Sequence, residues 1–133
     1  MPRLLLLEDN TDDIKRAEAV ARQAGFTEIE VCSYATEGQR CLENAMRGEA
    51  PFPDAIVIDL DLGFESGFEL LRFWHGTPQL NSTPVVIWTM ADEQREMCKL
   101  FGVERFVSKY EGPQALHSVL SAIIADEVSP ASA

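Results

Sequence analysis

Five short segments with strand patterns alternate with five segments of helical spacing, and this alternation restricts the fold more than any other feature of the sequence. Most of the strand segments are apolar runs, while EIEVCSY alternates apolar and polar residues. Runs rich in Leu, Ile and Val are typical of strands that are buried on both faces. Strands are expected in residues 3–9, 28–34, 54–59, 84–90 and 105–109, and helices in residues 11–25, 36–48, 67–76, 91–102 and 113–127. Thr11 is the expected cap of the first helix, and Gly25 is its expected end.

Strict strand–helix alternation with short connections predicts a parallel sheet whose two faces are both covered by helices. We therefore expect a flavodoxin-like α/β fold, a doubly wound (βα)5 sheet with strand order 2-1-3-4-5. One domain over residues 1–126 accounts for the pattern. The small and polar residues 127–133 are expected to form a flexible tail.

The charge balance limits the classes of partner. Against 22 acidic residues stand 11 Lys and Arg, a formal net charge of -11, which disfavours nucleic acid and anionic membranes. A cation or a basic protein surface fits better. The 3 cysteines have no metal-site or disulfide-framework spacing, and the apolar run Leu4–Leu7 is too short to span a membrane, so a cytoplasmic protein is expected.

Polar side chains gather where the expected strands end. Glu8 and Asp9 follow the first strand, Asp59 follows the third, Thr89 ends the fourth and Lys109 ends the fifth. The carboxyl ends of parallel strands meet at one edge, where such folds bind their ligands. Close carboxylates repel one another, and a divalent cation with hard oxygen ligands, above all Mg²⁺, relieves that repulsion.

This constellation resembles the receiver domain of two-component response regulators over about residues 3–124. Within that family, EDNTDDI and PQLNSTPVVIWTMAD resemble the first loop and the approach to the fourth strand of single-domain regulators that partner bacteriophytochromes. The resemblance implies that Asp59 is the phosphoacceptor in a Mg²⁺-dependent reaction. The metal ligands that it implies are Glu8, Asp9, Asp59 and the backbone carbonyl of Asp61.

The resemblance also implies how the phosphoryl group is held and how its presence is signalled. Thr89, Lys109 and the backbone N–H groups of Leu60 and Met90 are expected to bind the phosphoryl group. Thr89 and Phe106 are expected to form the switch.

The function that follows is signalling rather than classical enzymology. A histidine kinase, within the subfamily a bacteriophytochrome, is expected to donate the phosphoryl group, and slow autodephosphorylation is expected to remove it. A changed surface then signals to a downstream protein, with a homodimer forming through the fourth helix, fifth strand and fifth helix.

Three residues depart from the family pattern. Tyr110 follows Lys109 where a proline with a cis bond is common, Gly63 stands where proline is frequent, and Met90 follows Thr89 where a small residue is usual. Met90 is expected to lean over the phosphoryl pocket.

Two other functions compete with phosphotransfer signalling. One is a receiver-like adaptor that is not phosphorylated. The other is a small aspartyl-phosphate phosphatase, because DLDL is similar to the nucleophile motif of haloacid-dehalogenase-like enzymes. Those enzymes usually place a hydroxyl residue where Gly63 stands, which disfavours the phosphatase.

Overall fold

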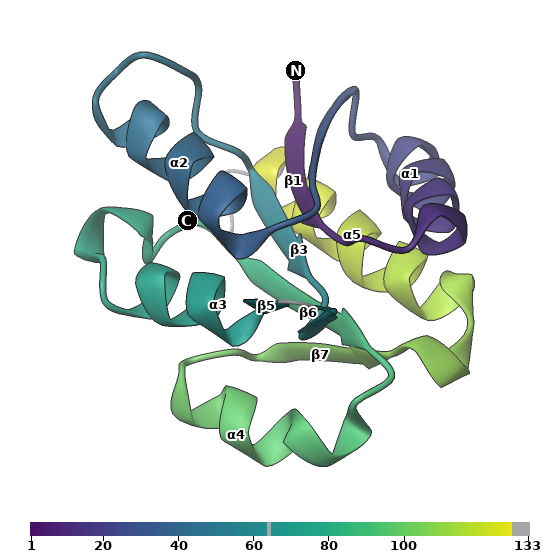
Figure 1. The fold of residues 1–133 in the computed structure, drawn as a ribbon. Helices are drawn as coiled ribbons and strands as arrows, with labels where there is room; N and C mark the ends of the chain where they lie inside the picture. The colour runs from purple at the N-terminus through teal and green to yellow at the C-terminus, as the bar shows by residue number, and fades with distance from the viewer. Residues whose placement is uncertain (64, 129–133) are drawn as a thin grey trace.

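The computed structural model describes residues 1–63 and 65–128 (Figure 1). Its central sheet has five parallel strands in the order β2-β1-β3-β6-β7, which confirms the expected order 2-1-3-4-5. These strands are β1 (Arg3–Leu7), β2 (Glu28–Cys32), β3 (Ala55–Ile58), β6 (Val85–Thr89) and β7 (Arg105–Ser108).

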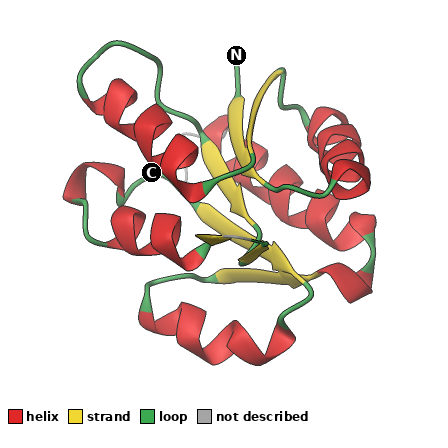
Figure 2. Cartoon of the chain, viewed as in Figure 1, coloured by secondary structure: helices red, strands yellow, loops and turns green. Residues whose placement is uncertain are grey.

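The helices cover both faces of this sheet (Figure 2). They are α1 (Thr11–Ala24), α2 (Ala35–Met46), α3 (Phe68–His75), α4 (Arg95–Leu100) and α5 (Pro113–Val128). Helices α1 and α5 pack together on one face, while α2 and α3 lie on the other (Figure 1).

Alternation along each strand divides the apolar side chains between two cores. Leu4 and Leu6 of β1 join the core beneath α1 and α5, whereas Leu5 and Leu7 join the core beneath α2 and α3. Successive side chains of a strand point to opposite faces, so a strand that feeds two cores must be apolar at every position. This explains why the interior strands β1, β3 and β6 are largely apolar, whereas the edge strands β2 and β7 are not.

The helix ends differ in detail from the sequence expectation. Asn10, not Thr11, caps α1, because its side chain accepts a hydrogen bond from the N–H of Asp13. The expected helix over 91–102 begins as a 3₁₀ turn at Asp92–Gln94 and becomes α-helical only at Arg95. Helix α5 continues to Val128, and residues 129–133 of the expected tail lie outside the described residues.

The segment after β3 contains a small element that the sequence pattern did not predict. Strands β4 (Asp61–Leu62) and β5 (Glu65–Ser66) pair antiparallel, apart from the main sheet. Gly63 follows β4 with a φ of 73°, a left-handed value that glycine adopts at little cost. Within the described part of the chain, no helix is long and apolar enough to cross a membrane.

Candidate functional site

Four of the predicted site residues meet at the carboxyl edge of the sheet. Glu8 follows β1, Asp59 follows β3, Thr89 ends β6 and Lys109 follows β7. Glu8 and Thr89 are fully buried, and Asp59 is 5 % exposed. All four line one cavity of about 470 Å³, and Asp9, Asp61 and Met90 line it too. The structure therefore brings together polar groups from the carboxyl ends of four separate strands.

Lys109 lies at the centre of this group. Its Nζ donates hydrogen bonds to Glu8 Oε2 at 2.7 Å, Asp13 Oδ2 at 2.7 Å and Asp59 Oδ2 at 2.8 Å. The same ammonium lies 4.8 Å from the ring centroid of Trp88, within the range of a cation–π contact. One positive charge thus serves three carboxylates, and the Lys109 side chain is only 8% exposed.

The electrostatic balance of the pocket follows from burial and from these contacts. Burial lowers the pKa of Lys109, but its hydrogen bonds to Asp13, Asp59 and Glu8 outweigh that effect and raise the pKa above its usual value. Burial raises the pKa of the Glu8 carboxyl to about 7; the hydrogen bond from Lys109 opposes this shift, and the charge of Asp59 adds to it. Three carboxyl groups therefore share one ammonium, and Glu8 is partly protonated near neutral pH.

Backbone N–H groups hold the two buried carboxylates in position. Glu8 Oε1 accepts hydrogen bonds from the N–H groups of Asp9 and Asn10, both at 3.1 Å, and Asp59 Oδ1 accepts one from Asp61 at 3.2 Å. The turn after Asp59 packs against Gly67, where an added Cβ would lie 2.1 Å from the Asp59 carbonyl oxygen. A side chain at position 67 is therefore incompatible with the present path of the Asp59 backbone.

The mouth of the cavity carries the more exposed members of the predicted set. Asp9 and Asp61 are exposed, and Met90 is 55 % exposed. Met90 follows Thr89 directly and lines the cavity, as expected from its position. The side chain of Leu60, by contrast, is buried in the core beneath α2 and α3, which leaves only its backbone available to the pocket.

The expected switch pair is split between the pocket and the neighbouring core. The Thr89 hydroxyl accepts a hydrogen bond from the N–H of Ala91 at 3.2 Å. Phe106 is half-buried, outside the residues that line the cavity, and packs against the core beneath α2 and α3. The guanidinium of Arg95 lies 4.4 Å from the ring centroid of Phe106 and donates to the Phe106 carbonyl at 3.3 Å. Phe106 thereby joins β7 to α4.

The loop after Lys109 has a trans peptide bond, like every peptide bond in the described ranges. Residues Lys109–Glu111 form a 3₁₀ turn that is capped by the Ser108 side chain, which accepts a hydrogen bond from the Tyr110 N–H at 3.2 Å. Glu111 completes a capping box by accepting from the N–H of Ser108. The absence of proline is thus accommodated by a capped turn.

The sequence analysis missed Asp13, which contacts Lys109 as closely as Glu8 does. It also missed Glu93, which lines the cavity mouth. The signal for Asp13 was its place in the acidic segment EDNTDDI, which directly follows the first strand. Asp13 lies within α1 and not at a strand end, so the strand topology alone does not group it with the site.

Comparison with known proteins identifies the fold and the family. The family model described as "Response regulator receiver domain" matches residues 4–121. No curated protein sequence matches the chain. Among solved structures, the chain is similar to the phosphorylated cyanobacterial phytochrome response regulator RcpA, with 22% identity, a TM-score of 0.79, and coverage of 97% of this chain and 95% of that one.

Two further solved structures of response regulators are similar to the chain. The bacteriophytochrome response regulator RtBRR is 26% identical, with a TM-score of 0.76 and coverage of 95% of this chain and 77% of that one. The Mn(2+)-bound form of response regulator Rcp1 is 21% identical, with a TM-score of 0.76 and coverage of 92% and 91%. With its parallel sheet, its acidic edge and this family match, the chain belongs to the receiver domains of response regulators.

Proposed function

We propose that this receiver domain accepts a phosphoryl group on Asp59 from the phosphohistidine of a histidine kinase. The observation that carries the proposal is the contact of the buried Asp59 carboxylate with the Lys109 ammonium, 2.8 Å away, at the edge where ligands bind in such folds. A buried carboxylate that faces a cation and an open cavity is suited to act as a nucleophile toward phosphorus.

The reaction follows from these groups. A carboxylate oxygen of Asp59 attacks phosphorus, the bond from phosphorus to the histidine nitrogen breaks, and the nitrogen keeps the electron pair. Lys109 stabilises the negative charge on the phosphoryl oxygens, and the Thr89 hydroxyl donates to one of them. The N–H groups of Leu60 and Met90 are further donors, because a backbone N–H is independent of the side chain.

The donor set fits a divalent cation, and Mg²⁺ is the proposed ion. The carboxylates of Glu8, Asp9 and Asp59, with the Asp61 carbonyl, offer the hard oxygen ligands that Mg²⁺ prefers. Bound there, the ion supplies positive charge that offsets the phosphoryl oxygens. The proposal is supported by the three carboxylates of Glu8, Asp13 and Asp59, which share the single ammonium of Lys109. The similar regulator Rcp1 is described in a Mn(2+)-bound form.

The output is proposed to pass through Thr89 and Phe106. Phosphorylation would draw the Thr89 hydroxyl from the Ala91 N–H toward the phosphoryl group and let Phe106 move inward. Since Arg95 stacks on Phe106, this movement would shift α4 relative to β7. The surface of α4, β7 and α5 would then change, both for a downstream protein and for a homodimer.

The proposed donor is a histidine kinase of the bacteriophytochrome kind, acting in the cytoplasm. This proposal is supported by the similar structures of RcpA, a cyanobacterial phytochrome response regulator, and RtBRR, a bacteriophytochrome response regulator. No feature of the described residues favours the adaptor or the phosphatase. Gly63 offers no hydroxyl at the position where the phosphatase motif usually has one. The acidic residues, Thr89 and Lys109 line one cavity, which supports phosphotransfer.

The decisive test replaces Asp59 by asparagine, which is nearly the same size but a poor nucleophile. Wild-type protein incubated with Mg²⁺ and acetyl phosphate should gain one acid-labile phosphate, measured by intact-protein mass spectrometry. Asp59→Asn should gain none while keeping its circular dichroism spectrum. The matched control is Asp12→Asn, an exposed carboxylate in the first turn of α1 that should be phosphorylated like the wild type. Phosphate uptake by Asp59→Asn at the wild-type rate would contradict the assignment.

A further inference from the structure

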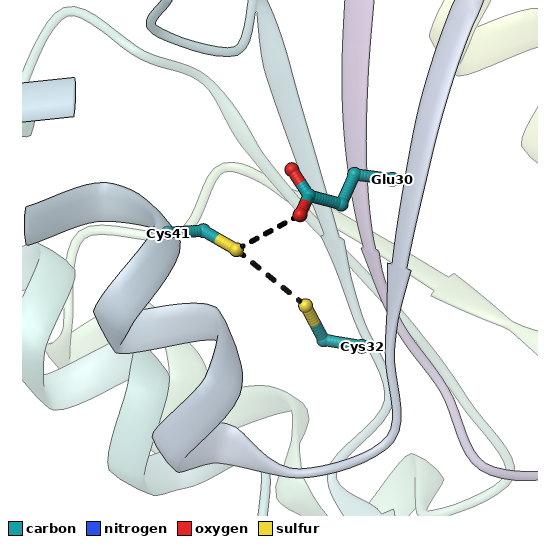
Figure 3. Close-up of side chains that lie close together, drawn as sticks. All are labelled: Glu30, Cys32 and Cys41. Carbon is teal, nitrogen blue, oxygen red and sulfur yellow. Dashed lines mark hydrogen bonds between the residues drawn. The ribbon is translucent and has the colours of Figure 1, made fainter. Parts of the chain in front are cut away.

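A second cluster of metal-ligating side chains lies at the far edge of the sheet. Glu30 and Cys32 are two residues apart on the edge strand β2, so their side chains share one face, and Cys41 of α2 points toward them (Figure 3). One ligand atom from each of the three residues lies within 4.8 Å of the other two. None of them lines the acidic cavity.

We propose that Glu30, Cys32 and Cys41 form a binding site for a thiophilic divalent cation such as Zn²⁺, with water as the fourth ligand. The two sulfur atoms lie 3.8 Å apart, and Cys41 Sγ lies 3.2 Å from Glu30 Oε2. A tetrahedral centre with Zn–S bonds of about 2.3 Å separates two sulfurs by about 3.8 Å. The thiol pair therefore already has the spacing that tetrahedral coordination requires.

Access and exposure support an open coordination position. Cys32 is buried, Cys41 is half-buried and Glu30 is exposed, so the cluster runs from the core to the surface. Glu30, Cys41 and Asn44 line a cavity of about 490 Å³. A cation can enter through this cavity, and the water that completes a four-coordinate site has room there.

The charge environment favours a cation over free thiolates. Burial, then the neighbouring Cys41 and the carboxylates of Glu30 and Glu37, raise the pKa of the Cys32 thiol. Burial and the hydrogen bond with Glu30 raise the pKa of the Cys41 thiol. Two thiolates beside a carboxylate repel one another, and a divalent cation compensates that charge while releasing two protons. A bound cation would link the edge strand β2 to α2.

The test uses Zn²⁺ and Co²⁺ on protein kept reduced with a phosphine, in a large excess of Mg²⁺. Magnesium occupies hard-oxygen sites such as the acidic pocket but does not compete for thiolates. We expect one equivalent of Zn²⁺ to bind in competition with a chromophoric chelator, and Co²⁺ to give a thiolate-to-metal charge-transfer band. Phosphorylation of Asp59 does not enter this measurement.

Three variants test whether the cation binds to this cluster or to another cysteine of the chain. Cys41→Ser should weaken Zn²⁺ binding by at least about 100-fold, more than loss of an outer-shell partner. It should also reduce the charge-transfer band of bound Co²⁺, because Cys32 is then the one thiolate left in the site. Glu30→Gln should weaken binding while the band remains. The control is Cys98→Ala, which removes a buried thiol on α4, away from the cluster, and should leave both readouts unchanged. Thermal unfolding of each variant without metal shows that it folds.

Three results would overturn the proposal. The first is reduced wild-type protein that takes up no Zn²⁺ in excess Mg²⁺. The second is bound Co²⁺ without a sulfur band, since oxygen ligands alone would then hold it. The third is loss of two free thiols to a disulfide in air, with no metal uptake after reduction, which would make Cys32 and Cys41 a redox pair instead.

Discussion

At the scale of single residues, Lys109 determines how far the negative charge of the acidic pocket is compensated. It binds the oxygens of Glu8 and Asp59 that a divalent cation would also approach, and its side chain is only 8% exposed. An ammonium and a dication that share ligands must compete, even though both are needed when a phosphoryl group adds negative charge. In the proposed reaction, Lys109 would therefore oppose metal binding before phosphorylation and assist the transfer of the phosphoryl group.

Replacing Lys109 by methionine separates these two effects. Lys109→Met should bind Mg²⁺ more tightly, because the competing ammonium is gone, yet accept phosphate from acetyl phosphate at least tenfold more slowly. Without metal, it should be less stable by about 3–5 kcal/mol, the usual cost of removing one partner of a buried ion pair. Mg²⁺ titration and urea unfolding measure these changes, with the exposed Lys99→Met as control. Weaker Mg²⁺ binding in Lys109→Met would contradict the competition.

Met90 provides a second test at this scale. Its side chain lines the cavity mouth beside Thr89 while remaining 55 % exposed, a placement suited to limit the approach of water. Met90→Ala should shorten the lifetime of the aspartyl phosphate and speed loading by small donors, up to about tenfold, or about 1.4 kcal/mol in barrier. The exposed Met97→Ala on α4 is the control. Unchanged or slower rates in both steps would mean that Met90 does not restrict access.

At the scale of elements, the sequence predicted what strong patterns determine. All five main strands and all five helices were predicted, because apolar runs and helical spacing extend over whole elements. The cap of α1 was misplaced by one residue, since Asn10 and Thr11 are adjacent and both are good caps. The β4–β5 pair was missed because strands of two residues are too short to show a period.

The candidate site was predictable to the same extent. Residues at strand ends could be grouped because topology alone brings Glu8, Asp59, Thr89 and Lys109 to one edge. Asp13 could not be grouped in this way, since its contact with Lys109 depends on how α1 is set against the sheet. Nor could pattern alone reveal the approach of Cys41 to Cys32, which is fixed by the packing of α2 on β2.

Gly67 lies between β5 and α3, and its close packing against the end of β3 predicts that a side chain is poorly tolerated there. Gly67 precedes α3 with a φ of -60°, which any residue adopts, so only space requires glycine there. An added Cβ would lie 2.1 Å from the Asp59 carbonyl and 2.8 Å from Ile58. Gly67→Ala should lower the free energy of unfolding by about 1–3 kcal/mol, as overpacking does, and slow phosphorylation by displacing Asp59.

The control for this prediction lies at the other end of the same helix. Gly76 also has a negative φ, and its added Cβ would meet its nearest atom, the Arg72 carbonyl oxygen, at 3.3 Å. Gly76→Ala should therefore cost less stability and leave the phosphorylation rate unchanged. Urea unfolding and acetyl phosphate kinetics measure both variants. If Gly67→Ala lost no more unfolding free energy than Gly76→Ala and kept the same phosphorylation rate, the turn after Asp59 would adjust to the added methyl group without moving the carboxylate.

At the scale of the whole molecule, charge and exposed apolar side chains determine how the domain meets a partner. The formal net charge of -11 makes two copies repel one another, and salt screens that repulsion. On α4, Met97 is 46% exposed and Leu100 is 74% exposed. Burial of such side chains in a dimer would favour association against the repulsion.

This balance predicts how self-association depends on phosphorylation, salt and Leu100. Phosphorylation changes association only if the two states bind differently, as the proposed movement of Phe106 beside α4 would cause. Sedimentation velocity should show stronger association with beryllofluoride, a phosphoryl mimic, and stronger association again at higher salt. Hydrogen exchange should change within residues 90–124. Leu100→Ser should abolish this association while leaving phosphorylation intact. The control is Tyr34→Ser, near the opposite edge strand β2, which should associate like the wild type. If beryllofluoride changed neither the association constant nor the hydrogen exchange of residues 90–124, the surface that changes on phosphorylation would lie elsewhere.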